Sequence, residues 1–247
     1  LRLLERNRMP SAAIVAASLT LAASESPERV FVPVAEARQL IVAGATVIDA
    51  RAGRAEAPYL PQAVVVDWMS FRDGWLRTGR LDDDLEDVRR RLERLGVTSE
   101  GPVVVYGSMA DGWGDEGRIW WMLRYLGHEQ VFIVDGGVAA WQRAGLPTSD
   151  RAAKPKRRGD LRISTLRKLR ADWRRVDALR KREDARVVDV RRKDEFDGAT
   201  PFWSPRGGHV PGSVNLYWAD FIGRDGTLLP RDAIRNTLAG AGIEPQH

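Results

Sequence analysis

Residues 102–126 read PVVVYGSMADGWGDEGRIWWMLRYL, which is a β-branched run, a glycine-rich loop and a tryptophan-rich segment. The run at 102–106 predicts a strand that is buried on both faces, and 118–126 predicts a helix that ends at Gly127. A strand that leads through a loop into a helix is the unit of an α/β fold. Ligands of such folds bind beyond the carboxyl ends of the strands, so the loop at 107–117 is the first place to look for chemistry.

The same alternation continues on both sides of this stretch. Short apolar runs are separated by helical patterns, several of which stop at a glycine. This order predicts a parallel sheet with helices on both faces. The predicted helices cover 34–42, 82–95 and 138–144, and the further strands cover 45–49, 63–66 and 131–134.

The composition excludes several kinds of chemistry. The 247 residues contain no cysteine, three histidines and nine tryptophans, and 43% of them are hydrophobic. The chain therefore has material for buried cores, but within this sequence there is no disulfide, no thiolate metal site and no cysteine nucleophile. The histidines are widely spaced and lack an HExxH-like pattern, so we predict neither a metal site nor a cofactor.

Three patterns of the first half recur in the second half in the same order. Each pair is separated by a similar offset, namely 140, 150 and 146 residues. An ordered set of three matches indicates an internal duplication. The pairs are TVIDAR at 46–51 with RVVDVR at 186–191, the segments that contain an apolar run and then Trp and Phe at 60–71 and 210–221, and the helical patterns at 81–95 and 230–241.

Together these motifs resemble the tandem rhodanese-domain sulfurtransferases, the thiosulfate and 3-mercaptopyruvate sulfurtransferase group. The first half carries the downstream signature of the family, RIWWMLRYLGH at 118–128 and VDGG at 134–137. The second half carries the upstream signature, VDVR at 188–191 and GHVPGSVN at 208–215. The resemblance covers residues 30–247.

The resemblance implies an α/β fold with two rhodanese-like domains, each a parallel sheet with helices on both faces, the second of them incomplete. We accordingly expect four parts: a signal-like or flexible N-terminus at 1–29, an inactive first domain at 30–150, a basic linker at 151–172 and a truncated catalytic domain at 173–247.

The implied reaction moves sulfane sulfur from thiosulfate or 3-mercaptopyruvate to a thiophilic acceptor through a cysteine persulfide. The family's cysteine opens the loop after the central strand, where backbone N–H groups and a helix N-terminus stabilise a thiolate. In the first half this position is Gly107, and Asp111, Asp115 and Glu116 make the loop unfavourable for an anion. We therefore expect the first copy to be inactive.

In the second copy the offset of 146 residues maps Gly107 to position 253. We therefore expect the nucleophile to lie beyond residue 247 and the 247-residue chain to be inactive in sulfur transfer. The alternatives are a protein that ends at this point and a non-catalytic rhodanese-like protein with a binding or regulatory role.

Two arginines of the second half resemble substrate-contacting positions of the family, Arg191 and Arg206. A guanidinium binds planar oxyanions through two hydrogen bonds and keeps its charge, which suits thiosulfate or the carboxylate of mercaptopyruvate. The structural alternatives are an Arg191 pair with Glu195 and a solvated Arg206. Asp49 and Asp189, each two residues before an arginine, are interpreted as salt-bridged loop anchors rather than catalytic carboxylates.

The N-terminal segment suits an export signal. Residues 1–11 are basic, and an apolar run at 12–23 follows that is too short to span a bilayer but fits a signal h-region. We expect export to the periplasm, with a cytoplasmic protein and a frayed extension as the alternative. No other stretch reaches the length of a membrane span.

Residues 151–182 contain fourteen basic and three acidic side chains, a net charge of +11 in a chain whose total is +5. Such a run suits a patch that binds nucleic acid or an anionic membrane. Its single aromatic residue, Trp173, disfavours base stacking. We therefore favour a solvated linker that leads into a helix, and expect the partners to be the small-molecule sulfur donor and acceptor.

Overall fold

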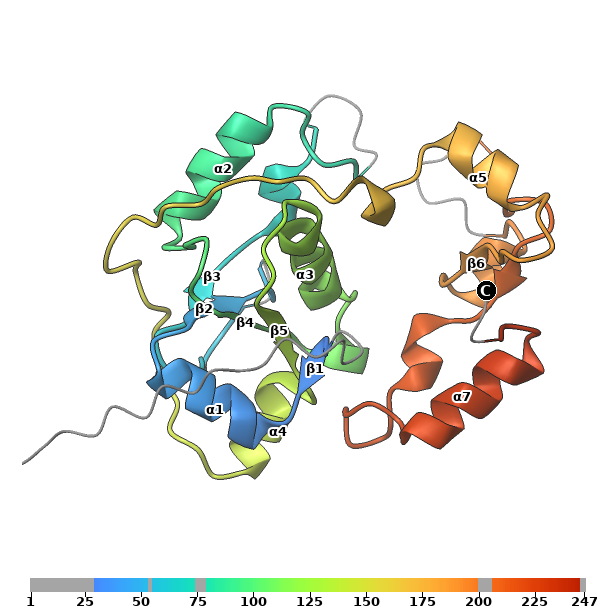
Figure 1. Cartoon of the computed structure of the whole chain (residues 1–247). Helices are drawn as coiled ribbons and strands as arrows, with labels where there is room; N and C mark the ends of the chain where they lie inside the picture. Colours follow the sequence, from blue (N-terminus) through green and yellow to red (C-terminus); the bar gives the residue numbers. More distant parts are fainter. Residues whose placement is uncertain (1–28, 53–54, 74–78, 200–205, 245–247) are drawn as a thin grey trace, which may run out of the picture.

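The computed structural model describes two α/β units of unequal size that are joined by a long connecting segment (Figure 1). The first unit holds a five-stranded sheet and the second a two-stranded sheet. The described residues are 29–52, 55–73, 79–199 and 206–244, so the signal-like N-terminus lies outside them.

Every strand pair in the first sheet is parallel, and the strand order is β1-β5-β4-β2-β3. The predicted strands are confirmed, although most are a residue or two shorter than expected. The two-residue strand β1 was not predicted, because two residues are too few to show a hydrophobic period. The strands are β1 (Phe31–Val32), β2 (Thr46–Asp49), β3 (Val64–Val65), β4 (Val103–Tyr106) and β5 (Val131–Val134).

Helices cover both faces of this sheet, as expected. The central strand β4 is fully buried: Val103 and Val105 pack in the core cluster with α2 and α3, whereas Val104 and Tyr106 pack in the cluster with α1 and α4. A strand with apolar neighbours on both faces has no polar alternation, which explains its continuous apolar run. The helices are α1 (Val34–Val42), α2 (Leu85–Arg94), α3 (Asp115–Tyr125) and α4 (Gly137–Arg143).

The second unit repeats the register of the first. Val188 pairs with Val214 as Ile48 pairs with Val64, which reproduces the 140- and 150-residue offsets. Helix α7 repeats the position of α2 in the sequence, at an offset of 146. The predicted duplication is therefore confirmed. The elements are α5 (Trp173–Leu179), β6 (Val188–Asp189), α6 (Lys193–Phe196), β7 (Val214–Asn215) and α7 (Arg231–Gly240).

The first part of the connecting segment lies on the first unit. The side chain of Leu161 is 3% exposed in the core that contains α2 and α3. The carboxylate of Glu93, itself buried, accepts hydrogen bonds from Arg158 Nη2 (2.8 Å) and from the Leu161 N–H (3.2 Å). Residues 151–160 are exposed or partly exposed, as expected for a solvated linker, but the segment is also anchored at Leu161 and Arg158, because a buried carboxylate needs donors.

A second contact joins the two units at the carboxyl end of β5. The Leu228 N–H donates to Asp135 Oδ1 at 2.8 Å, and Arg143 Nη2 of α4 donates to the carbonyl oxygen of Asp225 at 2.6 Å. Burial raises the pKa of Asp135. None of the described helices is both long enough and apolar enough to cross a bilayer.

The Glu93 contacts generate a pH-dependent stability. Hydrogen bonds from Arg158 lower the pKa of Glu93 below its usual 4.5. The resulting stability is present above the unfolded-state pKa and is lost as the pH falls through the folded-state pKa. We expect the free energy of unfolding, measured in urea between pH 7 and pH 3, to fall less steeply on acidification in Glu93→Gln than in the wild type. Glu100→Gln, at an exposed carboxylate paired with Arg162, is the matched control and should keep the wild-type slope. Equal slopes in all three proteins would contradict this role of Glu93.

Candidate functional site

The carboxyl ends of β2 and β4 are closed by a buried charge pair. Arg51 Nη2 lies 2.7 Å from Asp49 Oδ2, and the Tyr106 hydroxyl donates to the same oxygen at 2.7 Å. The side chains of Asp49 and Arg51 are 0% and 7% exposed. The guanidinium also lies over the rings of Tyr59 and Tyr106 and donates to the carbonyl oxygen of Pro58. The prediction that Asp49 is a salt-bridged loop anchor is confirmed.

The ionisation of these groups follows from their surroundings. Burial disfavours the charge on Arg51, but the hydrogen bonds and the negative charge of Asp49 outweigh it, so the pKa of Arg51 is raised. Burial and the neighbouring Asp49 carboxylate raise the pKa of Tyr106 far above its usual value. Arg51 is therefore charged and the Tyr106 hydroxyl neutral across the physiological range. Such a cluster stabilises the end of the sheet and offers no proton to a substrate.

The position expected for a nucleophile in the first unit, Gly107, lies directly after β4 and faces a carboxylate. A Cβ atom at Gly107 would lie against Glu116 Oε2, 2.7 Å from its Cδ and 3.3 Å from its Cβ. Glu116 is 5% exposed and stands in the first turn of α3. The space next to Gly107 thus holds a buried carboxylate, where a thiolate side chain would meet both steric overlap and charge repulsion.

Other residues of this loop also make contacts that fix its conformation. Asp115 Oδ1 accepts a hydrogen bond from Trp68 Nε1 at 2.8 Å, and the Gly107 carbonyl oxygen accepts one from the Val138 N–H at 3.3 Å. Met109 is 2% exposed with a positive φ of 50°. These contacts hold the loop closed. Sequence reasoning counted Glu116 only as one of three negative charges, because no residue pattern shows that its side chain folds back onto Gly107.

In the second unit the equivalent pair is more open. Arg191 Nη2 lies 2.6 Å from Asp189 Oδ2 and donates to the Gly208 carbonyl oxygen at 3.0 Å, and the Arg191 side chain is 43% exposed. Asp189 is therefore a salt-bridged anchor, as predicted. The partner of Arg191 is Asp189 rather than Glu195, the structural alternative considered from sequence. Asn215 of β7 completes the site by donating to the carbonyl oxygens of Asp189 and Arg191.

Arg206 lies on the loop that returns to this pair. The backbone of the next residue, Gly207, packs against Gly198. A Cβ atom added to Gly207 would lie 2.8 Å from the Gly198 Cα. Two residues after Arg206, the Gly208 carbonyl oxygen accepts from Arg191. The structure thus brings the segments that carry the two predicted arginines to the same end of β6, and Arg206 itself is exposed.

A hollow of about 570 Å³ lies at the carboxyl ends of β6 and β7, where ligands of parallel sheets bind. Neither Arg191 nor Arg206 is among its lining residues, whereas two cations that sequence reasoning passed over, Arg192 and Lys193, are. Their signal was present in the sequence as further basic residues directly after the Asp-x-Arg motif. Among the described residues no group of three or more histidine, aspartate or glutamate side chains is placed to hold a metal ion.

Comparisons with known proteins agree with this architecture. Residues 33–144 match the model of the rhodanese-like domain family. The chain is 32% identical to human 3-mercaptopyruvate sulfurtransferase over 73% of its own length and 61% of the relative's length. It is 31% identical to a putative thiosulfate sulfurtransferase of Haloferax volcanii (75% and 65%) and 29% identical to the sulfur carrier protein TtuD of Thermus thermophilus (75% and 67%). These matches span about two thirds of each relative's length or less.

The solved structures show the same fold. The rhodanese-fold structure of SseA from Escherichia coli, described as a 3-mercaptopyruvate sulfotransferase, matches with a TM-score of 0.73 at 24% identity, over 87% of this chain and 85% of that one. The structure of YnjE matches with a TM-score of 0.75 at 24% identity, over 88% and 56%.

The contact between Gly107 and Glu116 predicts an energetic coupling between the two positions. Gly107→Ala should destabilise the chain by about 1–3 kcal/mol, because the buried Glu116 side chain must move. Adding Glu116→Ala should remove most of that cost, which gives a coupling energy of about 1 kcal/mol or more in a double-mutant cycle measured by urea unfolding. Gly117→Ala is the control: its Cβ would meet nothing within 4 Å, and alanine favours the helix. Additive effects at positions 107 and 116 would show that Glu116 does not fill this space.

Proposed function

Because residues 33–144 belong to the rhodanese-like domain family, we propose that this protein is a sulfurtransferase whose chemistry belongs to its second unit. It moves sulfane sulfur from thiosulfate or 3-mercaptopyruvate to a thiophilic acceptor. The nucleophile is a cysteine in the loop that follows the next strand of the second unit, C-terminal to residue 247. The curated relatives named above, two of which are called sulfurtransferases, support the reaction class.

The observation that carries this proposal is the closed nucleophile position of the first copy. In the first copy the Asp-x-Arg pair is sealed by Tyr106, and the neighbouring nucleophile position is a glycine covered by a carboxylate. The second copy repeats the Asp-x-Arg pair with Asp189 and Arg191, and the hollow at this end of β6 and β7 is lined by two cations and two aspartates, Arg192, Lys193, Asp194 and Asp220. Because the nucleophile position of the first copy is closed, a sulfurtransferase built on this duplication would use the second copy.

The proposed reaction has two displacements. A thiolate attacks the outer sulfur of thiosulfate, a sulfur–sulfur bond forms, and the original bond breaks as sulfite leaves with the electron pair. The acceptor nucleophile then attacks the terminal sulfur of the persulfide and restores the thiolate. No external oxidant or reductant is needed.

Arg191 and Arg206 hold the donor in this proposal. The bonds that Arg191 makes to Asp189 and Gly208 use Nε and Nη2. Its remaining nitrogen, Nη1, takes part in none of these bonds and is the donor assigned to the oxyanion. The Asp189 hydrogen bonds also raise the pKa of Arg191, which keeps the guanidinium charged.

The alternative is a rhodanese-like protein that binds or regulates without catalysis. The first copy is sealed, and a second copy that was sealed in the same way would favour this alternative. One observation separates the two: the residues that follow His247 in the gene. A cysteine after an apolar strand and an aromatic residue supports the enzyme, whereas glycine, aspartate or serine at that position excludes it.

With the complete protein in hand, the donor is identified by steady-state kinetics with thiosulfate and with 3-mercaptopyruvate. Arg206→Ala and Arg191→Ala should each raise the KM for the true donor about tenfold or more, since each removes a charged hydrogen bond. Arg235→Ala, at an exposed surface arginine on α7, should leave KM unchanged. Residues 1–247 alone should show no turnover. An unchanged KM in Arg206→Ala would remove that residue from the donor site.

We also propose that the protein is exported, on the basis of the basic and apolar N-terminal segment. Mass spectrometry of the mature N-terminus tests this. Cleavage near residue 24 is the expected result, and a mature protein that retains residues 9–23 would contradict export by this signal.

A further inference from the structure

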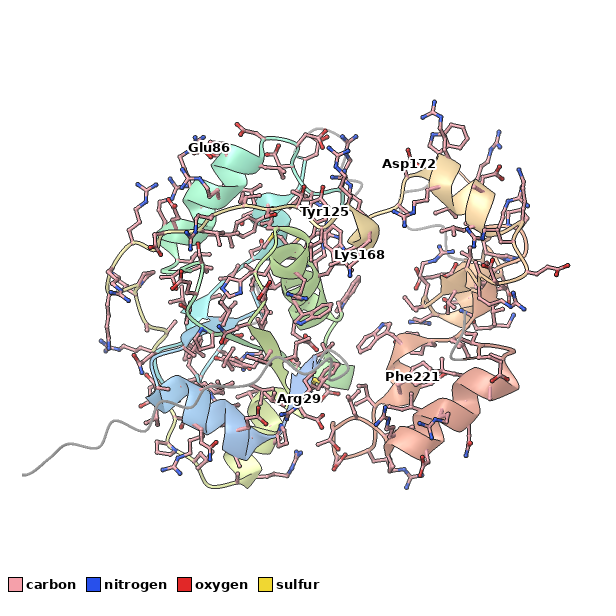
Figure 2. All side chains as sticks on the ribbon, viewed as in Figure 1. Arg29, Glu86, Tyr125, Lys168, Asp172 and Phe221 are labelled. Carbon is pink, nitrogen blue, oxygen red and sulfur yellow. The ribbon has the colours of Figure 1, made fainter. Side chains whose placement is uncertain are left out.

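A second cleft, of about 940 Å³, lies between α3 and the connecting segment, and neither the described residues of the 107–117 loop nor the Arg191 pair line it. Figure 2 shows the end of α3 that carries Tyr125 beside the part of the connecting segment that carries Lys168, which continues to Asp172 at the start of α5. The charged residues that line the cleft are five arginines and one aspartate: Arg80, Arg118, Arg167, Arg170, Arg175 and Asp172.

Arg118 is the innermost of these cations. Its guanidinium lies 4.5 Å from the ring centre of Trp121 and 5.3 Å from that of Trp68, and it donates to the Gly79 carbonyl oxygen. The charged group that acts on it is another cation, Arg170, and burial together with this neighbour lowers the pKa of Arg118. Within the described part of the chain, Arg118 has no carboxylate partner within 4.0 Å. A partly buried charge in this position is costly unless an anion balances it.

The carboxylates near the cleft do not balance its charge. Asp172 accepts the Arg175 N–H at 2.8 Å as the N-cap of α5. Asp83 already pairs with Arg80 and lies 3.7 Å from Arg170, at the outer limit of an ion pair. Like charges therefore face one another across the cleft with too few anions to neutralise them.

Arg175 helps to hold this arrangement in place. Its Nη1 lies 3.3 Å from the carbonyl oxygens of Arg167 and Arg170, so it ties the turn that carries these two arginines to the first turn of α5. The cleft is thus built from three segments, and internal hydrogen bonds keep its cations close together.

We propose that this cleft binds a compact, multiply charged oxyanion of the phosphate or sulfate type. Guanidinium groups bind such oxyanions through paired hydrogen bonds, and a multiply charged ligand would offset much of the excess of arginine over aspartate. The aromatic rings favour a compact ligand over a nucleic acid. Trp121 stacks on Tyr125 at 5.4 Å, and Arg118 and Arg170 lie over these two rings, so their faces are already in contact with other groups. This inference does not depend on the sulfurtransferase proposal.

The test is titration calorimetry of the 247-residue chain with pyrophosphate, inorganic phosphate, sulfate and thiosulfate, at ionic strength held constant with chloride. Saturable binding of at least one of these anions is expected. Arg170→Gln and Arg167→Gln should each weaken it about tenfold, as expected for a charged hydrogen bond. Arg118→Gln should weaken binding at least as much. If Arg118→Gln fails to fold, the Arg167→Gln and Arg170→Gln variants, whose residues lie on the connecting segment, still test the proposal.

Arg174→Gln is the matched control. Arg174 lies on α5 next to Arg175 and carries the same charge, but it lies over Trp173 and does not line the cleft. Its variant should bind within about twofold of the wild type. The proposal is overturned if no anion binds saturably or if Arg174→Gln weakens binding as much as Arg170→Gln. It is also overturned if a single-stranded oligonucleotide binds and pyrophosphate does not displace it.

Discussion

The buried ion pair of Asp49 and Arg51 stabilises the carboxyl end of the first sheet, and this role limits what else that end of the sheet can do. A charge this deep needs polar partners, and besides the ion pair itself the Tyr106 hydroxyl and the Pro58 carbonyl oxygen supply them. Removing one partner of such a pair costs about 3–5 kcal/mol. The end of the sheet where ligands of α/β folds bind is therefore used for stability here, and duplication makes this possible because the second unit carries another copy of the pair.

Much of this architecture could be predicted from the sequence, because burial imposes a pattern on the positions of the apolar residues. The run at 103–105 is apolar without alternation, since both faces of β4 meet helices, and that pattern alone indicates a covered parallel sheet. The duplication was also readable, because equal contacts need equal spacing: the 140- and 150-residue offsets reappear as the β2–β3 and β6–β7 registers. The Asp-x-Arg pairs followed from the same spacing.

Other features depend on contacts between residues that are distant in sequence, and these features could not be predicted from the sequence. Strand β1 has two residues and exists because β5 offers it an edge. Glu116 fills the space beside Gly107 only because α3 begins at Asp115, three residues before the predicted start, after Gly114 adopts a left-handed conformation. A one-turn shift of a helix start leaves the hydrophobic pattern almost unchanged, yet it decides which side chain faces the site.

The basic segment shows why net charge alone is a poor guide to a binding surface. Its +11 is divided between two uses that the sequence does not separate. Arg158 neutralises the buried Glu93 and fixes the segment to the first unit, so its charge is not available to a ligand. Farther along, Arg167 and Arg170 meet Arg118 around one cleft. The first use creates the second: because the segment is anchored at Glu93 and Leu161, its later arginines are held against α3. The positions of the exposed charges in this protein therefore depend on where the connecting segment is anchored to the core.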